Sequence, residues 1–396
     1  TANTYIGIFI IMFSVISSGM VAVMTQNIGA GRPGVAYQAR QLGLAFNAVL
    51  GVIMSLFLSL GAGTILSGVG VADALMQPAK TYLQIVGGFC ILNALIPICS
   101  SYLRAFGFSK EPLYASIIGN VINFCLNAFF LFVLHKGVAG VATATVISRI
   151  INLVIVVLLG AVLVKAKQHP ERESNRAVMG QIIRIGLPSA CETAIYNVSM
   201  TLVIRFLNQM DAQGLNVTAR SYTMQITNFS YCVGAALAQA NAIMTGWHIG
   251  AKEYDACDRG TKKAAVIGVI VAVILETVFT LCSGWIMQLF SKDPQMVSLV
   301  GKLLAIDIVL EIGRVTNLVY GQALKTSGDA VFPVVMGACF MILCSVGGTY
   351  LFGIRLGLLA VGAYIGMTGD ECVRAVGMYL RWKSGKWKEK GLVKSR

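Results

Sequence analysis

The stretch AGVATATVISRIINLVIVVLLGAVLV (residues 139–164) contains one charged residue, Arg149, in a run dominated by aliphatic and small side chains. About 20 consecutive residues of this kind cross the hydrocarbon core of a bilayer as a helix. In the whole chain of 396 residues, 56% are hydrophobic and 12% are charged. A soluble domain carries about a quarter charged residues, so this composition predicts a surface that faces lipid.

Similar runs recur along the whole chain. Eleven segments are apolar for long enough to span a bilayer: 4–27, 40–66, 82–104, 113–134, 139–164, 182–206, 217–247, 263–290, 298–321, 330–352 and 358–381. The predicted fold class is therefore an all-α, polytopic membrane protein.

The net charge of +14 could indicate a nucleic-acid partner, but the positions of the basic residues favour a membrane instead. They concentrate in alternate loops, such as those at Arg32, at Arg104 and at 165–176, and in the tail after residue 381. Cytoplasmic loops of membrane proteins carry this excess of Lys and Arg. We expect these loops and the C-terminus to be cytoplasmic, with no nucleic-acid partner.

An internal repeat divides the chain into two related halves. IGAGR (Ile28–Arg32) returns as IGAK (Ile249–Lys252) 221 positions later, RAFG (Arg104–Gly107) returns as KTSG (Lys325–Gly328) after 221, and GVAGVA (Gly137–Ala142) returns as GLLAVG (Gly357–Gly362) after 220. Matching loops fall on the same predicted side of the membrane, so the repeat is parallel and each half should hold six spans.

The repeat also predicts the domain boundaries. We expect an N-terminal lobe at 1–164, a cytoplasmic linker at 165–181, a C-terminal lobe at 182–381 and a basic cytoplasmic tail at 382–396. The first half shows five spans and the second shows six. The counterpart of 182–206 would lie before Thr1, so twelve spans are expected in the intact protein, whether the difference reflects truncation or a natural start.

Several motifs together resemble the multidrug and toxic compound extrusion (MATE) family, in its bacterial subgroup. They are MTQNIGAGR (Met24–Arg32), GLPSACE (Gly186–Glu192), LEIGR (Leu310–Arg314), the turns LRAFG (103–107) and LKTSGD (324–329), and DECVRAV with RWKSGKW (Asp370–Trp387). The resemblance implies two six-helix lobes around a central cavity and efflux of organic, mainly cationic, compounds driven by a proton or sodium gradient. It also implies the inner membrane of a prokaryote.

Nothing in the sequence indicates an enzyme or a cofactor. GAGRPG (Gly29–Gly34) matches a dinucleotide fingerprint, but a membrane helix precedes it where a strand is required. No phosphate-binding loop of the G-x-x-x-x-G-K-[ST] type occurs. The three histidines, His135, His169 and His248, lie at loops or helix ends and form no catalytic cluster. We expect a monomeric transporter of a small molecule, with no catalytic residues and with a proton or sodium as the coupling ion.

Ionisable residues near the middle of the predicted spans are the candidate functional residues, because charge there is costly. Glu192 lies one turn after Pro188 and shares a helical face with Tyr196. Asp307, Glu311 and Arg314 recur at i, i+4 and i+7 on another span. We expect these residues to couple ions to substrate, with a sodium site at Glu192, Asp307 and Glu311. The alternative is a self-neutralising network that only holds helices together.

Two further sets of residues have open interpretations. Asn120, Asn123 and Asn127 form one face of span 113–134 and either line the cavity or bond neighbouring helices. Glu276 has no charged partner on its own span, which favours a structural or peripheral role. Arg220 is expected near the outer interface, where a long side chain can reach water.

The sequence favours drug efflux over two other functions. A flippase for a lipid-linked oligosaccharide would share the two-lobe plan, but it should line its cavity with basic residues. A membrane-embedded enzyme would need a metal or an acid–base cluster, which the sequence lacks.

Overall fold

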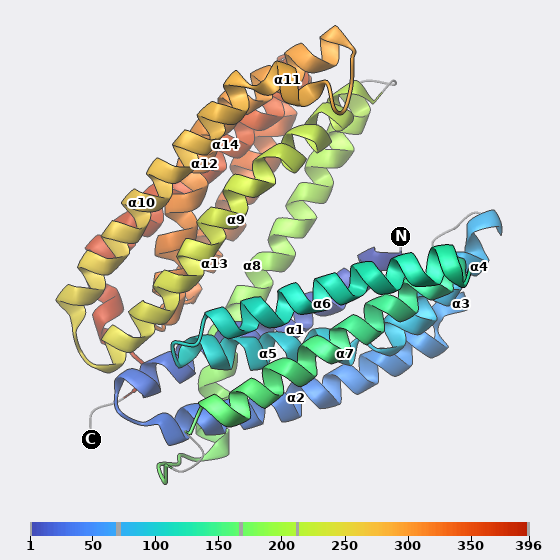
Figure 1. Cartoon of the computed structure of the whole chain (residues 1–396). Coiled ribbons are helices and arrows are strands. Elements are labelled where there is room, and N and C mark those ends of the chain that lie inside the picture. The colour runs from blue at the N-terminus through green and yellow to red at the C-terminus, as the bar shows by residue number, and fades with distance from the viewer. Residues whose placement is uncertain (1, 69–72, 166–168, 211–213, 394–396) are drawn as a thin grey trace. The chain divides into compact units, whose positions relative to one another are not determined.

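The computed structural model describes residues 2–68, 73–165, 169–210 and 214–393, and the side chains within these ranges except those of 2–10, 68, 73 and 74. All regular elements in these ranges are helical, which confirms the predicted all-α class. The chain forms two compact units, Thr1–Ala190 and Cys191–Arg396. In each unit long helices run alongside one another (Figure 1).

The N-terminal unit begins with two long helices joined by a tight turn. Its helices are α1 (Ala2–Gly29), α2 (Pro33–Leu60), α3 (Ala62–Gly68), α4 (Asp73–Tyr82), α5 (Ile91–Ala105), α6 (Lys110–Ala128), α7 (Gly137–Leu163) and the first part of α8 (Asn175–Met210), with π-helical segments at Leu83–Gly87 and Phe129–Val133.

The C-terminal unit repeats this order. It contains the rest of α8, α9 (Leu215–Gly250), α10 (Tyr254–Leu281), α11 (Ser283–Met287), α12 (Pro294–Thr326), α13 (Val331–Phe340) and α14 (Leu359–Lys383), with π-helical segments at Met341–Val346 and Thr349–Arg355 and a 3₁₀ turn at Lys386–Glu389.

The repeat is visible in the backbone of its three anchor turns. Residues with positive φ occur in matching pairs: Gly31 (72°) and Lys252 (63°), Gly107 (88°) and Gly328 (99°), and Gly137 (51°) and Gly357 (69°). The first two pairs are 221 positions apart and the third is 220 apart, which are the offsets found in the sequence. Left-handed backbone is rare outside such turns, so the two halves turn their chain by the same local geometry.

Six helices among the described residues are long and apolar enough to cross a membrane, or seven if the bent pair Leu75–Gly87 and Ile91–Ala105 is one span. All of them lie within or overlap the eleven predicted segments. Of the other predicted spans, α8 and α9 have 36 residues each, α12 has 33 and α14 has 25. These four are less apolar because they carry the polar side chains of the site described below.

Part of the predicted linker at 165–181 is helical, because α8 begins at Asn175. The first half of α8 packs tightly on α1: a Cβ on Gly186 would collide with the carbonyl oxygen of Val15. Glu173 accepts a 2.6 Å hydrogen bond from Arg32. The two compact units divide within α8, between Ala190 and Cys191. Residues 166–168 of the predicted linker lie outside the described part of the chain.

The predicted tail at 382–396 is packed on the C-terminal unit as far as the structure describes it, leaving out 394–396. The rings of Trp382 and Trp387 stack at 4.1 Å and are each 1% exposed. Arg381 and Lys390 both bind the buried carboxylate of Asp329, at 2.7 Å each. These contacts close the cytoplasmic end predicted for α14.

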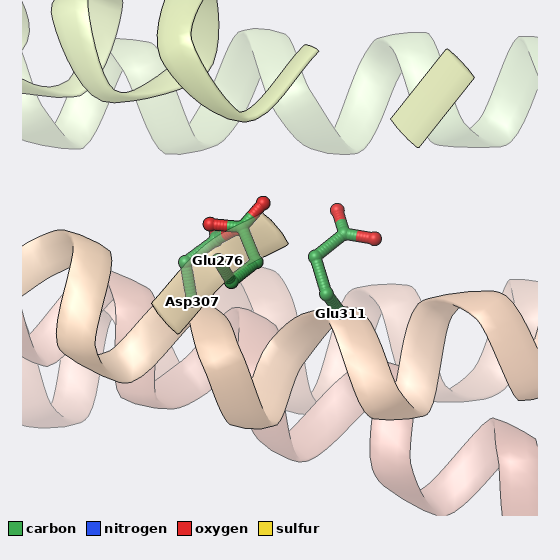
Figure 2. A group of neighbouring side chains, drawn as sticks. All are labelled: Glu276, Asp307 and Glu311. Atoms are coloured by element: carbon green, nitrogen blue, oxygen red, sulfur yellow. The ribbon is translucent and has the colours of Figure 1, made fainter. Parts of the chain in front are cut away.

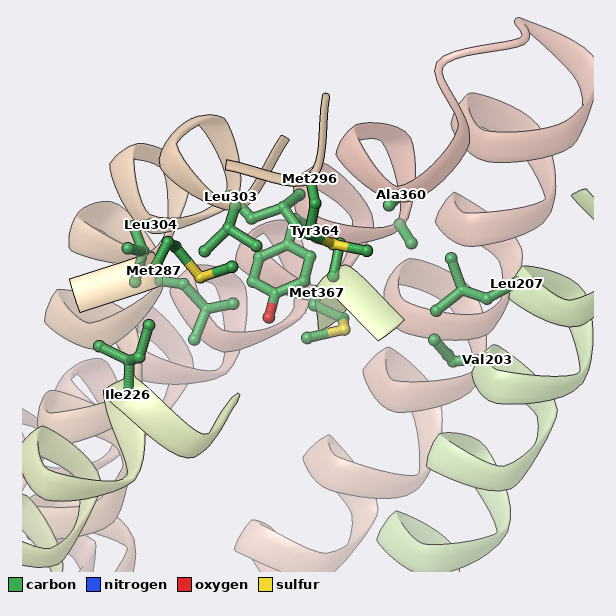
Figure 3. Close-up of a cluster of buried hydrophobic side chains, with 14 residues drawn as sticks. Val203, Leu207, Ile226, Met287, Met296, Leu303, Leu304, Ala360, Tyr364 and Met367 are labelled. Atoms are coloured by element: carbon green, nitrogen blue, oxygen red, sulfur yellow. The ribbon is translucent and has the colours of Figure 1, made fainter. Parts of the chain in front are cut away.

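A cluster of buried apolar side chains holds together the helices that carry the site. It joins α8, α9, α11, α12 and α14 through residues such as Val203, Leu207, Ile226, Leu303 and Tyr364. Figure 3 shows the Tyr364 ring in the middle of this cluster. Close packing of this kind fixes the positions of neighbouring polar side chains.

Candidate functional site

A cavity of about 480 Å³ lies inside the C-terminal unit. Its size is typical of a site for a small organic ligand. The wall contains the aromatic rings of Tyr196, Tyr231 and Tyr364 together with four methionines. Seven charged residues also line it: Glu192, Asp307, Glu371, Arg220, Arg314, Lys325 and Arg374.

Most of the charged groups in the wall are neutralised by a direct partner. Lys325 binds Glu192, with 2.5 Å between Nζ and Oε2. Arg374 is 3% exposed and binds both carboxylates of its own helix, Glu371 at 2.9 Å and Asp370 at 2.8 Å. Removing one partner of such a buried pair is costly, because it leaves the other charge uncompensated.

Arg314 connects the cavity wall to a deeper group of acids. Its Nη1 binds Glu311, which is fully buried and lies one turn earlier on α12. Its Nε lies 3.8 Å from the Oε1 of Glu371 on α14. Asn317 donates a 2.9 Å hydrogen bond to the other oxygen of Glu371. Arg314 therefore touches carboxylates on two helices at once.

Three buried carboxylates lie together behind this arginine, and we call them the acid cluster: Glu276 on α10 with Asp307 and Glu311 on α12. They are 0%, 2% and 0% exposed, and one oxygen of each lies within 4.8 Å of one oxygen of the other two. Figure 2 shows Glu276 beside Asp307, with Glu311 further along α12. Both oxygens of Glu276 and one oxygen of each of the others have no hydrogen-bond partner.

The predicted site residues therefore fall into two groups. Asp307 and Glu311 lie together as their spacing predicts, and Arg314 binds Glu311. Glu192 and Tyr196 line the cavity, but Glu192 pairs with Lys325 and is not a member of the acid cluster. The predicted grouping of Glu192 with Asp307 and Glu311 differs from this arrangement, because depth along a span says nothing about the direction in which its side chain points.

The three asparagines of α6 belong to the N-terminal unit, and two of them form a chain of side-chain hydrogen bonds that reaches α7. Asn127 donates to Asn123 at 3.0 Å, and Asn123 donates to Ser148 on α7 at 3.3 Å. Asn120 is exposed. The bond between α6 and α7 favours the interhelical interpretation for Asn123 over contact with a substrate.

Sequence reasoning missed two residues of the site. Glu276 was expected to be structural or peripheral, yet α10 packs against α12 and brings it to the acid cluster. Arg220 was expected near an interface, yet it is 5% exposed and lines the cavity. Their charge alone could have identified both residues, because an ionisable residue inside a membrane span is a functional candidate even without a partner on its own helix.

The helices and the site together define a class of protein. The chain contains long apolar helices, and its C-terminal unit holds a polar cavity of ligand size with buried carboxylates beside it. This is the arrangement of a multi-pass membrane transporter, in which ionisable groups at depth mark the path of an ion or a substrate.

The chain belongs to the MATE family of transporters. The family's sequence model, described as MatE, matches residues 1–129 and 188–351. The chain is 32% identical over 398 residues to "Uncharacterized transporter YisQ" of Bacillus subtilis, covering 99% of this chain and 87% of that protein. It is 22% identical to "Probable multidrug resistance protein NorM" of Thermotoga maritima, covering 95% of this chain and 82% of the relative.

Solved structures show the same fold. A crystal structure of MATE in the straight conformation superposes with a TM-score of 0.88 at 19% identity, over 98% of this chain and 87% of that one. A transporter of the MOP superfamily from Pyrococcus furiosus, reported with a binding pocket of reverse polarity, superposes at 0.85 with 18% identity, over 99% and 87%. Family membership makes this chain a transporter and not an enzyme.

Proposed function

We propose that the protein is a secondary antiporter that exports small organic compounds in exchange for protons or sodium ions, and that the acid cluster holds the coupling ion. The observation that carries this proposal is the cluster itself, formed by Glu276, Asp307 and Glu311. Only Arg314 among the described cations touches it.

The electrostatics of the cluster call for an additional positive charge. Two ionised carboxylates 4.8 Å apart repel by about 3 kcal/mol at an effective dielectric constant of about 20. Three of them carry a charge of −3, and Arg314 supplies +1. Protons or a bound cation must provide the remaining balance, which is the requirement for a site that exchanges an ion.

The donor set also fits a hard cation. Carboxylate oxygens are the ligands of such ions, and oxygens that share one ion at about 2.3–2.6 Å lie at most about 5 Å apart. The spacing in the cluster is within this limit. Four of its oxygen atoms have no hydrogen-bond partner and are free to bind an ion or a proton.

The position of Arg314 supports coupling between this ion and the substrate. Asp307 belongs to both the acid cluster and the cavity wall, and Arg314 lines the cavity while it binds Glu311 of the cluster. A cation in the cluster would compete with Arg314 for Glu311 and shift the guanidinium towards Glu371, 3.8 Å away. Ion occupancy would thereby change the charge that the cavity presents to a substrate.

The residues that line the cavity suit an aromatic organic substrate. Tyr196, Tyr231 and Tyr364 offer ring faces, which attract organic cations as well as other rings. Its acids Glu192 and Glu371 are paired with basic side chains. A flippase for lipid-linked oligosaccharides would be expected to present mainly basic groups, so this mixed and largely neutralised wall favours export of small compounds.

We place the protein in the inner membrane of a prokaryote as a monomer, with the C-terminus in the cytoplasm. The basic residues of alternate loops and of the tail support this orientation. A reporter enzyme that is active only in the cytoplasm should be active when it is fused after Arg396. A reporter that is active only outside the cytoplasm should be inactive at the same position.

Transport into everted membrane vesicles that contain the protein tests which energy source drives export. With ethidium as the probe, an imposed proton or sodium gradient should drive uptake into the vesicles. ATP should drive none when ionophores abolish both gradients. ATP-driven uptake in the presence of the ionophores would reject the antiporter proposal.

A further inference from the structure

One cation of the cavity lacks the partner that the others have. Arg314, Lys325 and Arg374 each bind a carboxylate directly. Arg220 forms no ion pair with any described carboxylate. Among the described residues, its one hydrogen bond runs from Nη2 to the thioether sulfur of Met200, at 3.6 Å, and its Nε has no hydrogen-bond partner.

This arginine is not a surface residue that reaches water. It is 5% exposed and lies in the second turn of α9, on a face with the buried residues Thr223 and Thr227. A buried charge without a partner is unfavourable unless another group compensates it. Because Arg220 faces the cavity, the compensating group can come from a ligand there.

We infer that Arg220 binds an anionic group, a carboxylate or a phosphate, on the transported compound. The guanidinium presents its N–H donors in a planar fork that matches either oxyanion through two parallel hydrogen bonds. Tyr196, Tyr231 and Tyr364 in the same cavity provide ring faces for an aromatic body. The substrate class is thus an aromatic compound with an acidic group, with or without a positive charge elsewhere.

This inference rests on the proposed function, because it takes the cavity as the substrate site. Binding measured without an ion gradient tests anion recognition separately from ion coupling. If ion coupling fails, Arg220 can still select an anion; if anion selection fails, ion coupling can still hold. The probes are two dyes that differ by one group, rhodamine 110 with a free carboxylate and its methyl ester rhodamine 123. Fluorescence anisotropy with the purified full chain gives both affinities.

The wild-type protein should bind rhodamine 110 at least about tenfold more tightly than rhodamine 123, the effect of one charge-assisted hydrogen-bonded pair. Arg220→Gln should remove this preference, while the cationic ester still binds with retained or higher affinity because a positive charge leaves the cavity; a melting temperature near that of the wild type shows that the variant is folded. Arg220→Lys should keep part of the preference. The matched control is Arg205→Gln, at an exposed position on α8, and it should behave as the wild type does.

Geranyl pyrophosphate distinguishes the two sources of the anion. If it displaces rhodamine 110 at lower concentration than a carboxylate competitor, and does so only with Arg220 present, the anion is a lipid phosphate. If geranyl pyrophosphate displaces rhodamine 110 less effectively than the carboxylate competitor does, Arg220 binds carboxylates. Equal affinity of the wild type for the two dyes, no binding of rhodamine 110, or an unchanged preference in Arg220→Gln would overturn the inference.

Discussion

Replacing Glu276 by glutamine removes one of three buried negative charges and keeps the volume of the side chain. The oxygens of the acid cluster lie within 4.8 Å of one another, so a shared cation is no further than this from Glu276. At an effective dielectric constant of about 20, the lost attraction is about 3 kcal/mol. The ion concentration that gives half-maximal transport should therefore rise about a hundredfold.

The assay is ethidium transport in proteoliposomes at increasing sodium concentration and, separately, at increasing proton concentration. The ion that drives transport in the wild type is the one whose dependence should shift. Thermal stability of Glu276→Gln should be unchanged or higher, because both oxygens of Glu276 lack hydrogen-bond partners. Asp255→Asn is the matched control, since Asp255 is exposed on the same helix. An unshifted ion dependence in Glu276→Gln would refute the assignment of the ion to the cluster.

Three other changes separate the roles of nearby groups. Glu192→Gln leaves Lys325 without its 2.5 Å partner, so ethidium affinity should fall while ion dependence stays near that of the wild type; an equal shift in ion dependence would instead make Glu192 an ion ligand. Arg314→Lys keeps the charge but loses the planar fork that touches two helices, so ion flux without ethidium, measured with ²²Na⁺ or a pH dye, should increase. Gly186→Ala places a methyl group against the α1 backbone and should lower stability by about 1–3 kcal/mol, whereas Gly180→Ala meets no atom within 4 Å and should leave the melting temperature unchanged or raised.

The fold was largely predictable because a bilayer permits few solutions. Long apolar segments must satisfy their backbone groups internally, so they form helices. The repeat was readable because its turns need particular residues: Gly31, Gly107 and Gly137 all have positive φ. The end of the linker was not predictable, since the close packing of Gly186 on α1 depends on a contact between segments far apart in the chain.

The site was predictable in its residue types and depth but not in its pairings. The spacing of Asp307 and Glu311 on one helix fixes their common face. Glu276 joins them from another helix, and Lys325 reaches Glu192 across a separation of 133 residues in the sequence. Such pairings depend on how each helix is rotated about its axis. The sequence does not determine this rotation when a helix carries polar residues on more than one face. The prediction for Arg220 was wrong for the same reason.

An antiporter must exchange one solute for the other, so ion flux driven by the organic substrate is the decisive measurement. Proteoliposomes are preloaded with ethidium, diluted into medium without it, and followed with ²²Na⁺ and with an internal pH dye. Ethidium leaving through the wild-type protein should draw sodium ions or protons into the liposomes, although no ion gradient is imposed. The variant with Glu276→Gln, Asp307→Asn and Glu311→Gln should show no such flux. Ethidium exit without movement of either ion, or the same ion flux in the triple variant, would rule out ion exchange at the acid cluster.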